Sequence, residues 1–248
     1  MQRLPMKEQN IYDDPIFFKN YQALRVNDTG LNGIMEEPAL RALLPDLKGK
    51  IVLDLGSGFG DFARYAHSKG AKKVYGIELS SNMIEQAKKL THTDDIEYIH
   101  ASMTDPMTFV EHFDFIISSL AIHYIENFNQ LASEVYSHLK EGGKFIFSVE
   151  HPMCTAHASS FMKNESGEFI CMPVDNYQDE SIRHTSWFVD NVIKYHRTVE
   201  SYIMGLLNAG FVIDALKEPK VINEALLAKP EAEIFNRYSP FLIISAHR

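Results

Sequence analysis

Three glycines at alternate positions mark the part of this chain where ligand chemistry is first expected. They lie in the run Val52-Leu53-Asp54-Leu55-Gly56-Ser57-Gly58-Phe59-Gly60, which begins with the apolar pattern of a buried strand. Glycine lets a backbone turn sharply and approach a ligand where a Cβ would collide with it. Glu78 ends the next predicted strand, at the spacing where a carboxylate accepts hydrogen bonds from ribose hydroxyls. The segment therefore predicts a nucleoside-binding site.

Two acids beside the glycines indicate which kind of nucleoside fits. Asp54 lies two residues before the first glycine, and Asp61 directly follows the last. The spacing is Gly-x-Gly-x-Gly, whereas dinucleotide-binding loops read Gly-x-Gly-x-x-Gly and hold a pyrophosphate at the helix N-terminus. Carboxylates at both ends of the loop repel a pyrophosphate but attract an ammonium or sulfonium group. We therefore expect a cationic nucleoside derivative.

The overall composition is that of an ordinary soluble domain of enzyme size. The chain has 248 residues, 45% hydrophobic and 23% charged, which excludes a disordered or fibrous protein. Its net charge of −9 lacks the basic surface that a phosphate backbone requires, so nucleic acid is not expected as a partner. Cys154 and Cys171 are too few for a disulfide framework or a zinc site, and no metal is predicted. No membrane-spanning run and no secretion signal are visible, and we expect a cytoplasmic protein.

Strand and helix patterns alternate through the middle of the chain, as is typical of a parallel sheet covered by helices. Strands are predicted at 50–55, 74–79, 96–101, 113–120, 144–150, 211–216 and 241–246, and helices at 17–25, 61–69, 81–90, 129–139 and 199–208. We interpret 1–248 as one domain with an N-terminal lid (1–47), a cofactor-binding core (48–150), an irregular substrate cap (152–198) and a C-terminal helix with a strand pair (199–248).

Four segments of this chain resemble the class I S-adenosylmethionine-dependent methyltransferases. Residues 52–60 are similar to their first motif, 76–80 to their second, 113–124 to their fourth-strand segment and 139–145 to the turn into their fifth strand. The resemblance is strongest to small bacterial methyltransferases of the methyltransferase-11 or -25 type. It implies an α/β, Rossmann-like seven-stranded sheet of order 3-2-1-4-5-7-6, with strand 7 antiparallel and helices on both faces. It also implies S-adenosylmethionine as cofactor and S-adenosylhomocysteine as product.

The same resemblance assigns the cofactor-binding residues. It places Asp54 and the glycine loop against the methionine moiety, Glu78 against the ribose and Leu120 beneath the sulfonium. The family commonly has an acid after the third strand, whereas this chain has Ser102, so the adenine contact falls to Ser102 or to Asp105. The predicted cofactor residues are Tyr21, Arg25, Asp54, Gly56, Ser57, Gly58, Gly60, Glu78, Leu79, Ser102, Met103 and Leu120.

Arg25 is predicted four residues after Tyr21 on one face of a helix in the lid. We expect Arg25 either to bind the methionine carboxylate, for which a guanidinium is a good partner, or to form a structural ion pair. Trp187 and Phe188 of the cap either line the substrate pocket or form the core of the cap.

Four titratable residues are candidates for proton transfer. His123 follows the fourth strand, Glu150 and His151 close the fifth, and His196 precedes the late helix. Each of them can instead be an ordinary structural residue. A general base is required only if the methyl acceptor must lose a proton.

The predicted function is S-adenosylmethionine-dependent methyl transfer to a small molecule by in-line displacement, in a monomer or homodimer. The chain has Ser118-Ser119-Leu120-Ala121 where enzymes that methylate nucleic-acid or glutamine amino groups usually have an N/D-P-P-Y/F element. Three alternatives stay open: a non-catalytic module that binds the cofactor, an NAD-dependent dehydrogenase, and an aminopropyl transferase. In the last case Arg25 would have no carboxylate to meet.

Overall fold

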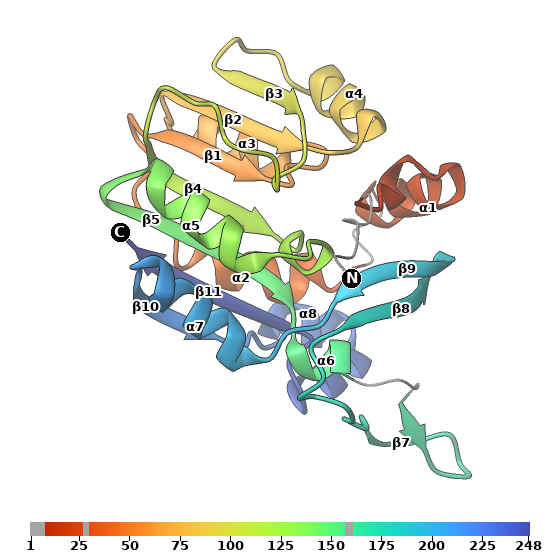
Figure 1. Cartoon of the computed structure of the whole chain (residues 1–248). Helices are drawn as coiled ribbons and strands as arrows, with labels where there is room; N and C mark the ends of the chain where they lie inside the picture. Colours follow the sequence, from red (N-terminus) through yellow and green to blue (C-terminus); the bar gives the residue numbers. More distant parts are fainter. Residues whose placement is uncertain (1–7, 27–29, 157–160) are drawn as a thin grey trace.

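The structure is a computed structural model that describes residues 8–26, 30–156 and 161–248 (Figure 1). Residues 1–7 of the predicted lid and 157–160 of the predicted cap lie outside this range. The central sheet contains β1 (Ile51–Leu55), β2 (Lys73–Glu78), β3 (Ile96–His100), β4 (Phe113–Ser119), β5 (Leu139–Glu150), β10 (Val212–Lys217) and β11 (Phe241–His247). Their order is β10-β11-β5-β4-β1-β2-β3, and β11 runs antiparallel to all the other strands of this sheet. The predicted strand order is confirmed.

Helices cover both faces of the sheet, as predicted. One face carries α2 (Glu37–Arg41), α3 (Asp61–Ser68) and α4 (Ser81–Leu90), and the other carries α5 (Phe128–His138) and α7 (Val199–Ala209). Successive side chains of a strand point to opposite faces, so Val52 packs with the first group of helices and Leu53 with the second. Local signals set the helix ends: the Ser80 hydroxyl accepts a hydrogen bond from the backbone of Met83, and Gly210 ends α7 in a left-handed conformation.

The N-terminal segment lies against the carboxyl edge of the sheet. It comprises η1 (Ile11–Asp13), α1 (Pro15–Val26) and a π-helical turn, η2 (Asn32–Glu36). The Asp13 carboxylate accepts hydrogen bonds from the Ser80 and Ser81 hydroxyls and from the backbone N–H of Asn82. These bonds fix the segment to the start of α4. A short turn, η3 (Ile122–Tyr124), follows β4 at the same edge.

The region predicted as an irregular cap contains structure of its own. It holds α6 (Pro152–Ala156) and two hairpins, β6 (Met162–Lys163) with β7 (Phe169–Cys171) and β8 (Ile182–Trp187) with β9 (Val189–Tyr195). The second hairpin lies beside α1 (Figure 1). It was not predicted because Phe188 supplies the positive φ at its turn, where Asn-Gly or Asp-Gly would be the usual signal.

A second unpredicted feature connects β10 to β11. This connection folds into α8 (Asn223–Ala228) and η4 (Pro230–Asn236), which pack against η2. In the described part of the chain, no helix has the length and apolarity that crossing a bilayer would need.

Candidate active site

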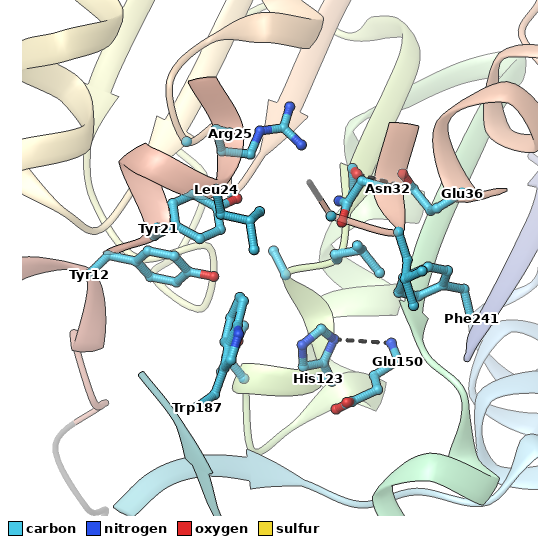
Figure 2. Close-up of a pocket in the computed structure, with 18 of the residues that line it drawn as sticks. Tyr12, Tyr21, Leu24, Arg25, Asn32, Glu36, His123, Glu150, Trp187 and Phe241 are labelled. Carbon is cyan, nitrogen blue, oxygen red and sulfur yellow. Dashed lines mark hydrogen bonds between the residues drawn. The ribbon is translucent and has the colours of Figure 1, made fainter. Parts of the chain in front are cut away.

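A cavity of about 1010 Å³ lies over the carboxyl ends of four strands. Asp54 of β1, Glu78 of β2, Ser119 of β4 and Glu150 of β5 all line it. Figure 2 shows side chains from η1, α1, η2, η3, β5, β8 and β11 around the same space. Small-molecule sites usually measure roughly 300–1,000 Å³, so this cavity has room for a nucleoside and a second ligand.

The glycine loop forms the floor of one end of this cavity. Gly56 has a φ of +76°, and a Cβ placed on it would lie 2.5 Å from the Cβ of Ala121. Gly58 also has a positive φ, but a Cβ there would meet no protein atom within 4 Å. The Gly58 N–H donates to the Glu78 carboxylate over 2.9 Å, and the Ser80 N–H donates to its other oxygen over 2.8 Å. The loop and the carboxylate are therefore held in place without a ligand.

Asp54 is a buried carboxyl group whose ionised form has no cationic partner among the described residues. Its side chain is 3% exposed, and Oδ2 has no hydrogen-bond partner among the described residues. Burial raises the pKa of Asp54 to about 8, and the negative charges of Glu78 and Asp61 add to the shift. A buried carboxylate without a partner is costly. An ammonium group in the cavity would relieve that cost, so this site fits a cationic ligand.

Most of the predicted cofactor residues line the cavity, and two do not. Those that line it are Tyr21, Arg25, Asp54, Gly56, Ser57, Gly58, Glu78, Leu79, Met103 and Leu120. Gly60 is outside the lining because it packs on Tyr98, whose hydroxyl would lie 1.9 Å from an added Cβ. Ser102 is also outside, because its hydroxyl donates to Glu8 and its N–H donates to Asp105. The structure gives these two residues structural contacts, and their assignment to the cofactor stays a prediction.

The four candidates for proton transfer divide equally. His123 and Glu150 line the cavity, whereas His151 and His196 do not. Nε2 of His151 bonds Glu218 Oε1 over 2.9 Å, and its Nδ1 accepts the Met153 N–H. Both ring nitrogens of His151 are thus engaged outside the cavity lining, and its catalytic role stays a prediction.

His196 is held in a similar way, and its catalytic role likewise stays a prediction. Its Nε2 bonds the Tyr177 carbonyl oxygen over 2.9 Å, and its Nδ1 lies 2.6 Å from Thr155 Oγ1. The ring is 2% exposed and ties the end of the cap to α6. It has no nitrogen left for a substrate.

Comparison with known proteins assigns the chain to a family. A family model described as a methyltransferase domain matches residues 53–147. The structure of an S-adenosylmethionine-dependent methyltransferase from Mesorhizobium loti is 37% identical, covers 88% of this chain and 100% of its own, and has a TM-score of 0.82. A Listeria monocytogenes structure assigned to the same class is 41% identical over 86% of this chain and 96% of its own, with a TM-score of 0.81. This chain belongs to the S-adenosylmethionine-dependent methyltransferases.

A full-length relative of this methyltransferase occurs in Haemophilus influenzae. That uncharacterized protein is 36% identical over 247 residues, which cover 96% of this chain and 97% of its own. S-adenosylmethionine is the cofactor of the class, and S-adenosylhomocysteine is its product. The residues present fit this cofactor, because Asp54 Oδ2 lacks a cationic partner and Glu78 retains lone pairs for hydroxyl donors.

Arg25 of the methyltransferase pairs with a loop acid. Its Nη2 lies 3.0 Å from Asp61 Oδ2, so the structure contains the ion pair that was one of the two expectations for this residue. The Arg25 side chain still lines the cavity. Tyr21, four residues earlier, turns its ring toward the same space (Figure 2).

An aromatic cluster joins α1 to the cap hairpin beside the cavity. Trp187 of β8 packs edge-on against Phe17 and Tyr21 of α1, with ring centroids 5.1 and 5.9 Å apart. Trp187 also lines the cavity, so it serves the cap core and the pocket together. Gln9 ties the same two elements, because its side chain donates to the Asn191 carbonyl and accepts from the Ile193 N–H. The N-terminal segment and the cap hairpin therefore form one roof.

His123 is neutral and has a defined tautomer. Burial lowers its pKa to about 3, with Lys194 and Arg197 opposing a positive charge on the ring. Its Nδ1 accepts the Glu150 N–H over 3.3 Å, so the proton of the neutral ring is on Nε2 (Figure 2). His123 therefore presents an N–H donor rather than a base to the cavity.

Several residues that line the cavity were not predicted from the sequence. Glu36 is 2% exposed, and Lys194, at 8%, places Nζ 2.7 Å from Glu150 Oε2. Phe235 and Phe241 come from the connection after β10 and from β11. In the sequence, Glu36 lies in Met35-Glu36-Glu37-Pro38, which reads as a surface helix start. Only the packing of η2 on the sheet reveals that it is buried.

Proposed function

We propose that this methyltransferase transfers a methyl group to a small molecule by in-line displacement. The observation that carries the proposal is the single cavity that extends from the glycine loop to Phe235 and Phe241. It offers a donor end, with Asp54 and Glu78, and a second end lined by His123, Glu150 and Lys194.

The roof favours a small acceptor over a macromolecule. Trp187 and Tyr21 line the cavity, Trp187 packs against Tyr21 and the buried Phe17, and Gln9 hydrogen-bonds the hairpin backbone. An acceptor on a protein or nucleic-acid surface would have to displace this packing. The net charge of −9 further disfavours a polyanionic substrate.

Bound S-adenosylmethionine supplies a methyl group on a positively charged sulfur. The protein holds the donor through the glycine loop, Glu78 and Asp54, and it excludes water with the aromatic roof. Orientation of two bound reactants contributes about 7–11 kcal/mol to such a reaction. The Nε2–H of His123 orients an acceptor that carries a hydrogen-bond acceptor atom, and the Lys194–Glu150 pair fixes the wall beside it.

Calorimetry and a label-transfer assay test this proposal. S-adenosylmethionine and S-adenosylhomocysteine should bind, NAD should not, and Glu78→Ala should abolish binding. Labelled methyl from S-adenosylmethionine should then enter the low-molecular-mass fraction of a bacterial extract, and should not enter added DNA or RNA. Tight cofactor binding with no transfer would instead indicate a non-catalytic module, and binding of NAD alone would indicate a dehydrogenase.

A further inference from the structure

Glu36 is a buried acid that lines the cavity and has no role in the proposed transfer as described so far. It ends the π-helical turn Asn32–Glu36 and is 2% exposed. Such turns are rare and occur often at functional sites. Glu36 lines the cavity near the carboxyl ends of β4 and β5, whereas the cofactor residue Glu78 ends β2, on the other side of β1. It therefore belongs to the acceptor end.

Two serines hold one oxygen of this carboxylate. The Ser119 hydroxyl donates to Glu36 Oε1 over 2.9 Å, and the Ser148 hydroxyl donates to the same oxygen over 2.5 Å. Among the described residues, Oε2 has no hydrogen-bond partner. Oε1 is thus hydrogen-bonded within the protein, and Oε2 is available to a ligand.

The backbone beside the two serines that hold Glu36 is strained. Leu120 directly follows Ser119 and has a φ of +52°, a conformation that costs a residue with a Cβ about 1–2 kcal/mol. Its N–H donates to the carbonyl and hydroxyl oxygens of Ser148, which hold it there. Leu120 itself lines the cavity, so the strained turn joins the donor end to Glu36.

The charges around Glu36 leave its carboxylate without a cationic partner. No described lysine or arginine forms an ion pair with it. Burial raises the pKa of Glu36, while the two serine hydroxyls lower it. The negative charge of Glu37 raises the pKa of Glu36 by a smaller amount, and the positive charge of Arg25 lowers it. Burial raises the pKa of Tyr21, and the charge of Glu36 adds to that rise.

The other cavity residues do not suit a base at this end. Nε2 of His123 carries a proton, and Glu150 pairs with Lys194. Asp54 and Glu78 lie at the cofactor end. Glu37 pairs with Arg41. Glu231 also lines this end, but it is exposed to solvent. Glu36 is the buried acid there, and its Oε2 has no hydrogen-bond partner among the described residues.

We propose that Glu36 accepts the proton lost by the methyl acceptor, which is therefore a protic nucleophile with an O–H or N–H group. The proposal rests on the proposed function. The acceptor lone pair forms a bond to the methyl carbon, the sulfur–carbon bond breaks and its electron pair stays on sulfur. The acceptor proton moves to Glu36 Oε2 and passes to water after the product leaves. Tertiary amines and thioethers have no such proton and are excluded as acceptors.

The Glu36→Gln variant tests this role and retains the hydrogen bonds from the two serines. Its amide oxygen still accepts from Ser119 and Ser148, but the side chain cannot take a proton. The probe is labelled S-adenosylmethionine with the low-molecular-mass fraction of a bacterial extract, measured in a single turnover. Transfer should fall about 10²- to 10⁴-fold, the usual contribution of a general base, with cofactor affinity unchanged. The matched control is Glu134→Gln, a glutamate that accepts the Met107 N–H at 2.9 Å outside the cavity, and its transfer should be unchanged.

The pH profile and the product separate a base from a merely structural residue. The wild-type rate should rise with pH through the titration of Glu36, and Glu36→Gln should lose this rise. Ser148→Ala removes a donor to the carboxylate, so it should move the rise to higher pH; this variant serves if Glu36→Gln fails to fold. Mass spectrometry should find the new methyl on an oxygen or nitrogen that had carried hydrogen.

Three results overturn the proposal. They are full transfer by Glu36→Gln, a quaternary ammonium or sulfonium product, and a Ser148→Ala profile identical to the wild type. A wild-type protein that binds cofactor but labels nothing would overturn the proposed function itself, and this inference with it.

Discussion

Asp54→Asn removes a buried carboxyl group whose ionised form has no cationic partner in the cofactor-free protein. Burial raises the pKa of Asp54 from 3.8 to about 8. Between these values the unfolded chain has lost the proton and the native protein retains it, so stability falls as pH rises. Each pH unit costs about 1.4 kcal/mol. By pH 7 the native state has lost about 4 kcal/mol relative to a side chain that cannot ionise.

Asparagine has nearly the same shape as the protonated acid and does not titrate. The cofactor-free variant should match the wild type near pH 4 and exceed it by about 4 kcal/mol at pH 7. For a chain of this size that corresponds to roughly 10 °C in Tm. Urea unfolding from pH 4.5 to pH 8, with the wild type and the variant side by side, measures the difference and cancels the other titrating groups.

The same substitution should weaken cofactor binding, although it stabilises the cofactor-free protein. Asp54 is largely protonated at pH 7 and must ionise to pair with an ammonium group, so binding should release about one proton per cofactor. Calorimetry in buffers of different ionisation enthalpy counts that proton. The variant should release none, and it should bind roughly 10- to 100-fold more weakly, since a charged hydrogen bond contributes about 1.5–3 kcal/mol. Equal stability of both proteins from pH 5 to pH 8, or binding without proton release, would refute the reasoning.

Two further predictions concern the glycine loop and His123. Gly58→Ala should cost about 1 kcal/mol of stability, from its positive φ alone, but should abolish cofactor binding because the new methyl enters the open cavity. Gly56→Ala adds a protein collision, so thermal melts should show the larger loss there, and the reverse ranking would contradict the structure. The pKa of His123 is about 3, so below pH 6.5 the unfolded chain binds a proton that the native protein does not. The wild type should then lose about 1.4 kcal/mol per pH unit more than His123→Asn, and equal acid sensitivity of the two would show that the ring is solvated.

The geometry of the glycine loop and Glu78 was predictable because its parts are local. Gly56, Gly58 and Glu78 lie within one strand-turn-helix-strand unit, and the hydrogen bond from Gly58 to Glu78 closes that unit. Turn geometry and strand register therefore determine their positions from short stretches of chain. The strand order followed from the resemblance of the same stretches to a known family.

For pairs of adjacent residues, the sequence did not indicate which one lines the cavity. Glu150 lines the cavity and His151 does not; Met103 lines it and Ser102 does not. His151, Ser102 and Met103 lie in the connections that follow β5 and β3, where tertiary contacts set the direction of each side chain. A motif near the correct edge therefore does not say which of two neighbours faces the cavity. Gly60 illustrates the same limit, since a ring from β3, and not a cofactor, requires the absence of its side chain.

The sequence by itself determined the sheet, the glycine loop, the acid at the end of β2 and thus the class of cofactor. Only the tertiary structure brought together the residues of the proposed acceptor end. Glu36, His123 and Lys194 come from three separate segments, and Phe235 and Phe241 come from a fourth. No spacing rule connects residues so far apart in the chain. Their meeting follows from η2, the cap hairpin and the connection after β10 burying their apolar surfaces over the same edge of the sheet.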